Sequence, residues 1–250
     1  MTSRGLDVFF RGLLDLEGFS GVDSSLNGLQ VDNDGGDIAK VAFGVDASLE
    51  TFKRAAQAGA GMLFVHHGLF WGSPLAVTGP HRLRLKALLD CNLALYAVHL
   101  PLDQHPRWGN NAVLAELLDL VAIEPFGVYQ GRKIGYKGTL GRPLRIDEAA
   151  DRLGGKPLGV YPFGVRENRT GAVISGGGAN EVRQAIQEGL DLYVTGEMSH
   201  QVYHDCLEAG INMIAAGHYV TEIGGVRKIM EQCANQLGLD VEFIDVPTGL

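Results

Sequence analysis

The sequence predicts an α/β protein with a mostly parallel sheet. Short apolar runs of strand length alternate with longer segments of helical period along most of the chain, a pattern typical of α/β folds. Its 250 residues, 46% of them hydrophobic, suit one large α/β domain or two small ones, with an ample core in either case. The alternation changes near Gly127 and returns near Gly171.

Apolar runs and amphipathic segments occupy 1–126 and 215–250. Helices are expected at 5–16, 48–59, 80–90, 110–120 and 222–238, and strands at 40–45, 62–65, 93–98 and 241–246. Asp46 or Ser48 is well placed to cap the helix that follows the first of these strands. For Asp46 this capping role is the expected one.

The stretch 127–214 opens with an alternating, half-exposed strand at 134–140 and a short helix at 147–153. A strand region follows at 157–161, and then the βα pattern resumes. It comprises strands at 171–174, 192–194 and 211–215 and helices at 180–189 and 199–209.

Composition excludes several classes of protein. The formal charge is −8 and no basic run occurs, so neither nucleic acid nor an anionic membrane surface is an expected partner. No apolar run approaches the roughly 20 residues of a membrane span, and no signal peptide is recognisable at the N-terminus. The three cysteines are isolated, which fits a reducing compartment. We expect a cytoplasmic protein.

The motif around which the chain is organised is the histidine pair His66-His67, which follows the predicted strand at 62–65. Imidazole is the commonest metal ligand in proteins, so the pair suggests a metal site. Successive side chains of a strand point to opposite faces. The two histidines can therefore share one task only if the strand has just ended, and otherwise they serve two centres. The alternative is a pair of half-buried loop histidines packed on Trp71.

Other potential ligands also follow predicted strands, where ligands bind in open α/β sheets. This group consists of His66, His67, His99, Asp103, Glu197, His218 and Glu222. It contains no thiolate, unlike a cysteine-rich structural zinc site, and it offers enough donors for two metals with Glu222 able to bridge them. Each member has a structural alternative: His99 as a hydrogen-bonded core histidine, Asp103 as a cap, and Glu222 as a carboxylate favoured by a helix dipole.

Three motifs resemble those of the NIF-three-like dinuclear metal-centre proteins, often labelled GTP cyclohydrolase type 2 homologues. They are His66-His67-Gly68-Leu69-Phe70-Trp71, Tyr96-Ala97-Val98-His99-Leu100-Pro101-Leu102-Asp103 and Gly217-His218-Tyr219-Val220-Thr221-Glu222. Shorter matches occur at 27–31, 109–111, 175–178 and 195–197, so the resemblance runs from about residue 5 to the C-terminus.

The resemblance implies that five residues bind two divalent metals: His66, His67, Asp103, His218 and Glu222, with Glu222 bridging. It implies two α/β lobes with mostly parallel sheets, the first made of 1–126 with 215–250 and the second of 127–214. It also implies a metal cleft between the two lobes and a ring-shaped homohexamer. His99 would lie close to the metals, and Glu197 and the glycine turn at 176–178 would line the cleft. A glycine turn before a helix is also a reasonable anion site, although a tight turn is its commoner role.

Two functions remain open at this stage. The first is a metal-dependent hydrolase acting on a small nucleotide or related phosphate compound, with His99 or Glu197 as the acid or base that is not bound to metal. The second is a metal-handling or scaffold protein that stores or delivers ions. Zn, Mn, Fe, Co and Ni all suit such ligands, so the sequence does not select the metal.

Overall fold

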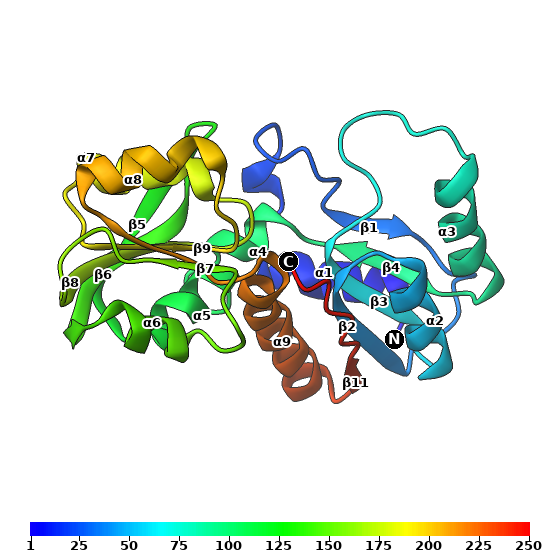
Figure 1. Ribbon diagram of the computed structural model, residues 1–250. Helices are drawn as coiled ribbons and strands as arrows, with labels where there is room; N and C mark the ends of the chain where they lie inside the picture. The colour runs from blue at the N-terminus through cyan, green and yellow to red at the C-terminus, as the bar shows by residue number, and fades with distance from the viewer. The chain divides into compact units, whose positions relative to one another are not determined.

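The computed structural model of the protein describes residues 1–250, which form two compact units (Figure 1). Unit 1 comprises 1–102 and 226–246, and unit 2 comprises 103–225 and 247–250. The α/β class and the two sheets are confirmed. The units divide before residue 103 and not at 126, because α5 (Asn110–Leu117) packs with the core of unit 2. No helix is both long and apolar enough to cross a membrane.

Unit 1 contains a five-stranded sheet whose order is β1-β4-β3-β2-β11. These strands are β1 (Gly28–Val31), β2 (Lys40–Asp46), β3 (Met62–His67), β4 (Ala94–Ala97) and β11 (Asp240–Phe243). All neighbours are parallel except β1, which runs antiparallel to β4. The prediction of a mostly parallel sheet is confirmed for this unit.

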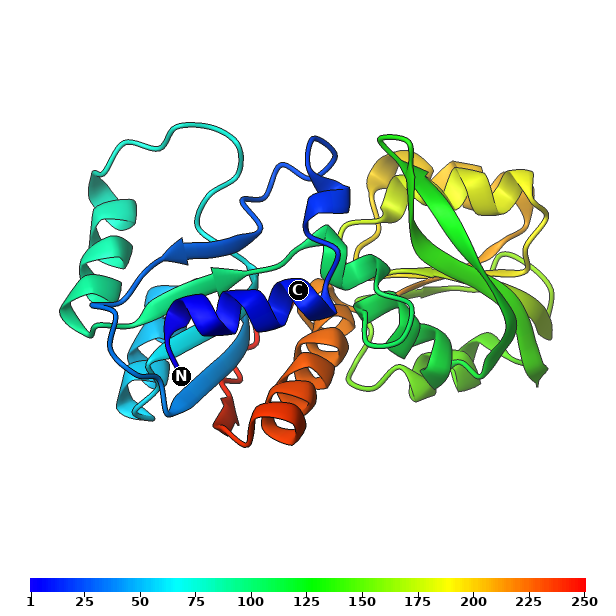
Figure 2. The same ribbon diagram turned by 180° about the vertical axis from the view of Figure 1, so that it is seen from behind.

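Helices cover both faces of this sheet (Figure 2). On one face lies α1 (Ser3–Leu13), whose Phe10 ring is 4.9 Å from the rings of Phe64 and Tyr96. On the other face, α2 (Leu49–Gln57) and α3 (Gly79–Asp90) join a core cluster that includes Leu63 and Val65. Alternate side chains of β3 thus pack into two separate cores, one on each face of the sheet.

Unit 2 contains a six-stranded sheet whose order is β5-β6-β8-β9-β10-β7. The strands are β5 (Leu120–Tyr129), β6 (Arg132–Leu144), β7 (Gly159–Tyr161), β8 (Asn168–Ile174), β9 (Leu192–Thr195) and β10 (Asn212–Ala215). Only β8, β9 and β10 run parallel, and the other three pairings are antiparallel, so this sheet is mixed. The hairpin of β5 and β6, closed by positive-φ residues Gln130 and Gly131, accounts for much of the difference.

Two helices pack on each face of this second sheet (Figure 1). Leu114 of α5 and Ala149 of α6 (Ile146–Arg152) belong to one buried cluster with Val194 and Ile214 of the sheet. The opposite face is covered by α7 (Val182–Gln187) and α8 (Tyr203–Ala209). The remaining two helices are α4 (Leu100–Gln104) and α9 (His218–Leu237). The chain passes from one unit to the other within each of them.

Candidate metal centre

Three histidines gather at the carboxyl ends of two neighbouring strands in unit 1. The strand β3 continues to His67, two residues beyond its predicted end, so the pair lies within the strand. The rings of His66 and His67 are nevertheless 4.6 Å apart, and the ring of His99, just after β4, lies 5.0 Å from that of His66. One ring nitrogen of each histidine lies within 4.8 Å of those of the other two.

Each of these imidazoles uses its Nδ1 atom in a hydrogen bond to oxygen. The Nδ1 of His66 lies 2.9 Å from the Val98 carbonyl oxygen. Asp46 and Asp23 place a carboxylate oxygen 2.9 Å from the Nδ1 of His67 and His99 respectively. When Nδ1 carries the proton, Nε2 carries the lone pair, which is the form that binds a metal. The three rings are therefore oriented as metal ligands are.

Asp46 was predicted to cap a helix, and the structure assigns that role to Ser48. The Ser48 hydroxyl accepts the Thr51 N–H at 3.2 Å, at the start of α2. Asp46 is the partner of His67 in the parallel pairing of β2 with β3, and its side chain orients that histidine. The position of Asp46 at the end of the adjacent strand is the signal by which sequence reasoning could have found it.

Asp23 is a second residue that sequence reasoning missed. Its carboxylate is buried and accepts hydrogen bonds from the backbone N–H groups of Ser25 and Leu100 and from the side chains of Asn27 and His99. Burial opposes ionisation, but these hydrogen bonds, led by that of His99, outweigh it and lower the pKa of Asp23. Because 76 residues separate Asp23 from His99, no motif joins them in the sequence.

Unit 2 supplies a buried carboxylate at Asp103, which is 6% exposed. The side chains of Asn110, at the start of α5, and Ser175, after β8, each donate a hydrogen bond of 2.8 Å to its Oδ1 atom. Asn110 and its neighbour Asn111 are themselves fully buried, and the side-chain oxygen Oδ1 of Asn111 accepts the Ser175 N–H. These hydrogen bonds fix the orientation of the Asp103 carboxyl group.

The second part of the site in unit 2 is the first turn of α9. This helix begins at His218, four residues earlier than predicted, so His218 and Glu222 lie one turn apart on the same face. The Nε2 of His218 is 3.2 Å from Oε1 of Glu222, and its Nδ1 is 2.5 Å from Oε1 of Glu197. Glu222 is 2% exposed. Glu197 therefore orients His218 through Nδ1 in the same way that Asp46 orients His67.

The two carboxylates keep His218 protonated in the absence of metal. The hydrogen bond to Glu222, opposed by burial and aided by the charges of Glu222 and Glu197, raises the pKa of His218 to about 9. In the metal-free protein the interaction of protonated His218 with Glu222 and Glu197 stabilises the fold. This stabilisation is fully present below the unfolded pKa of His218, and it is lost as pH rises through about 9. A metal bound at Nε2 would take the place of that proton.

Gly176 faces the donor atoms of His218 and Glu222. Its φ is +62°, and a Cβ atom there would lie 2.3 Å from Glu222 Oε1 and 3.0 Å from His218 Nε2. Its own N–H donates to the Thr221 hydroxyl at 3.0 Å, so this group of the glycine turn has a partner within the protein and is not available to an anion. The glycine leaves room beside the two donors that any other residue would fill.

The donor chemistry of both units fits a divalent metal. Imidazoles whose Nδ1 is hydrogen-bonded to oxygen, and carboxylates that accept hydrogen bonds, are ligand types that divalent transition metals take in exchangeable sites. The three cysteines are not part of the donor groups of either unit. These residue groups can bind a metal.

The space beside Gly176 generates a test. We expect Gly176→Ala to weaken metal binding at least tenfold, roughly the effect of disturbing the surroundings of a metal ligand. Gly189→Ala is the matched control, because Gly189 has a φ of +68° with no atom within 4 Å of the added methyl group. Both variants carry a backbone strain of about 1–2 kcal/mol, but only the first meets the donor atoms. Competition with a fluorescent chelator measures the affinities, and equal affinities in the two variants would contradict the assignment.

Comparisons with known proteins agree with the motifs. The family model described as Duf34/NIF3 (NGG1p interacting factor 3) matches residues 1–249. A protein of Deinococcus radiodurans named GTP cyclohydrolase 1 type 2 homolog is 47% identical over 232 residues, which cover 91% of this chain and 88% of the relative. A protein of Escherichia coli with the same name is 40% identical over 233 residues, covering 90% and 91%.

Solved structures share the fold over their whole length. A structure described as protein ybgI, of unknown function, has a TM-score of 0.92 and 36% identity, and each chain is covered completely. Reduced HcgD from Methanocaldococcus jannaschii has a TM-score of 0.85 and 26% identity, with 98% of each chain covered. The family match over nearly every residue, together with relatives above 40% identity, establishes that the chain belongs to the Duf34/NIF3 family.

Proposed function

We propose that the protein binds two divalent metal ions and uses them to hydrolyse a nucleotide or a related phosphate compound. The proposed ligands are His66 and His67 from unit 1 and Asp103, His218 and Glu222 from unit 2, with Glu222 bridging. One observation supports this assignment above the others. Each of the three histidine ligands places its Nδ1 on an oxygen atom, so each directs Nε2 as a metal ligand does.

The chemistry needs a proton carrier that is not itself a ligand. His99 suits this role, because its ring lies 5.0 Å from that of His66 and its Nδ1 is held by the buried carboxylate of Asp23. Its Nε2 can then accept and return a proton while the ring stays in place. Glu197, our other candidate for this role, is engaged with His218 Nδ1 and is better assigned to orienting that ligand.

When bound, two divalent metals supply Lewis acidity and lower the pKa of a water molecule to roughly 7. The surrounding residues would hold the ligands in place, Asp103 through the hydrogen bonds that Asn110 and Ser175 donate to it, and His67 through its hydrogen bond with Asp46. The name of the curated relatives favours ring-opening hydrolysis of a GTP-like substrate as the specific reaction. A metal-handling or scaffold protein is the alternative, and it would need the same ligands but no proton carrier.

Activity separates the two functions. With metal saturating, we expect turnover in a panel of nucleoside triphosphates, phosphate esters and amides. His99→Gln should lower the turnover roughly 10²–10⁴-fold, the usual contribution of a general acid or base, without lowering metal content. His204→Gln, an exposed histidine on α8, is the matched control.

An absence of turnover across the panel at any pH, while metal stays bound, would contradict the hydrolase and favour metal handling. Full activity in His99→Gln would contradict the assignment of His99 as the proton carrier. Glu222→Gln, compared with Glu231→Gln on an exposed position of the same helix, checks the bridging ligand by elemental analysis.

We further propose that the protein forms a homo-oligomer, a hexameric ring by resemblance to its family. An edge strand of unit 2 supports self-association. The strand β5 pairs on one side only and exposes four large apolar side chains, Val121, Ile123, Val128 and Tyr129. An exposed apolar edge is a template for pairing with another chain, and natural proteins avoid leaving one uncovered.

Light scattering tests this second proposal. The mass of one chain is 26.8 kDa, and we expect a several-fold multiple of it at micromolar concentration. Ile123→Lys should shift the protein towards smaller species, because burying an unpaired ammonium group opposes association. A single species of one chain mass in the wild type would refute self-association.

A further inference from the structure

A cavity separate from the candidate metal ligands lies in unit 2, at the opposite end of its sheet from Ser175 and His218. It has a volume of about 460 Å³, and its lining includes Asn212, the first residue of β10. His218 follows the other end of that strand, about 15–20 Å away at the rise of an extended chain. The volume is within the range of small-molecule sites, roughly 300–1,000 Å³.

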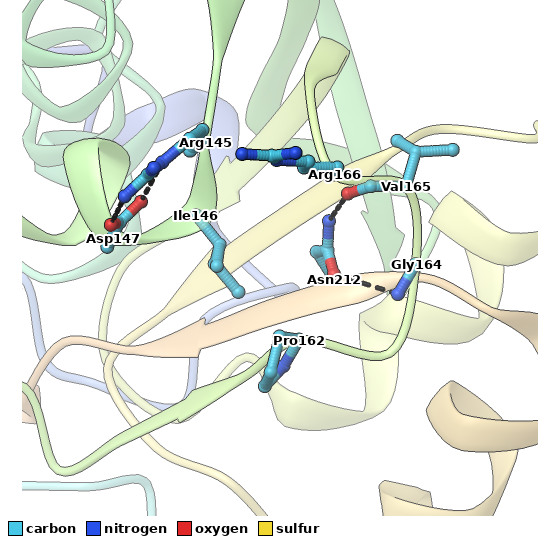
Figure 3. A pocket seen from close by; sticks show the side chains of 8 residues that line it. All are labelled: Arg145, Ile146, Asp147, Pro162, Gly164, Val165, Arg166 and Asn212. Atoms are coloured by element: carbon cyan, nitrogen blue, oxygen red, sulfur yellow. Dashed lines mark hydrogen bonds and ion pairs between the residues drawn. The ribbon is translucent and has the colours of Figure 1, made fainter.

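Two arginines from separate segments face this cavity (Figure 3). Arg145 precedes α6, and Arg166 lies between β7 and β8. Arg145 is held by Asp147, whose carboxylate accepts hydrogen bonds from its Nε at 3.0 Å and from its Nη2. Arg166 forms no ion pair in the structure, and its guanidinium extends towards Arg145. The lining therefore carries an uncompensated positive charge in a protein whose formal charge is −8.

The segment that carries Arg166 is anchored to the sheet. Asn212 is 1% exposed, and its side chain accepts the Gly164 N–H at 2.8 Å and donates to the Val165 carbonyl at 2.7 Å. A Cβ atom at Gly164 would lie 2.5 Å from the Gly210 carbonyl oxygen, so the segment packs closely there. A ligand would find Arg166 on a fixed segment and would lose little affinity to ordering it.

The rest of the lining consists of Asp147, Gly164 and Asn212 and of three apolar residues, Ile146, Pro162 and Val165. The unpaired guanidinium of Arg166 can bind phosphate oxygens through paired hydrogen bonds, and Arg145, whose Nε and Nη2 contact Asp147, can add its remaining N–H groups. Apolar walls favour a ligand that also has a carbon skeleton. We propose that this cavity, defined by Arg145, Arg166 and these walls, binds a small organic phosphate. The site is independent of the metal ligands and of the proposed hydrolysis.

Titration calorimetry on the full-length protein tests this site, with ribose 5-phosphate and inorganic phosphate as probes. We expect ribose 5-phosphate to bind more tightly than inorganic phosphate, and binding to survive removal of metal by a chelator. Arg166→Gln should weaken binding about tenfold or more, which corresponds to a loss of at least about 1.4 kcal/mol. Because Arg166 has no ion pair to lose, this variant should melt at the wild-type temperature.

The matched control is Arg183→Gln. Arg183 is an exposed arginine of unit 2 that pairs with Asp205 and does not line the cavity. It should leave the affinity for ribose 5-phosphate unchanged. The proposal is overturned if the wild type binds neither probe at millimolar concentration, if Arg166→Gln binds as well as the control, or if chelation abolishes binding. Equal affinity for the two probes would contradict the proposal that the apolar residues of the cavity bind the carbon skeleton of the ligand.

Discussion

The hydrogen bond between histidine Nδ1 and an oxygen atom is the interaction on which the candidate metal centre depends. It recurs at His66, His67, His99 and His218, with a backbone carbonyl as partner once and a carboxylate three times. Each bond selects the tautomer that offers Nε2 and holds the ring against rotation. Without such partners the histidines would sample several orientations, and ordering them would lower the affinity for metal.

The partners are supplied by the fold in a regular way. Parallel strands end at the same edge of a sheet, so Asp46 at the end of β2 meets His67 at the end of β3. In unit 2, Ser175 follows β8 and Glu197 follows β9, and both bond to candidate ligands. The cost of burying Asp23 and Asp103 is offset because each carboxylate accepts several hydrogen bonds. The strand ends and their hydrogen bonds thus hold the donor side chains in fixed orientations.

Local sequence pattern was sufficient to recognise the strand ends that carry histidine or carboxylate. It did not place the start of α9, which begins at His218 and not at 222 and so brings His218 and Glu222 onto one face. Asp23 was missed because its contact with His99 is non-local. The mixed sheet of unit 2 was missed because β5, with a buried first residue followed by five exposed ones, lacks the alternation of a half-buried strand.

Metal stoichiometry tests the central claim most directly. The protein would be stripped with a chelator, dialysed separately against Zn, Mn, Fe, Co and Ni, and its bound metal counted by elemental analysis. Two ions per chain for at least one of these metals is the result expected from five ligands with a bridging Glu222. A maximum of one ion per chain would contradict the dinuclear centre, and no retained metal would contradict the assignment of these histidines as ligands.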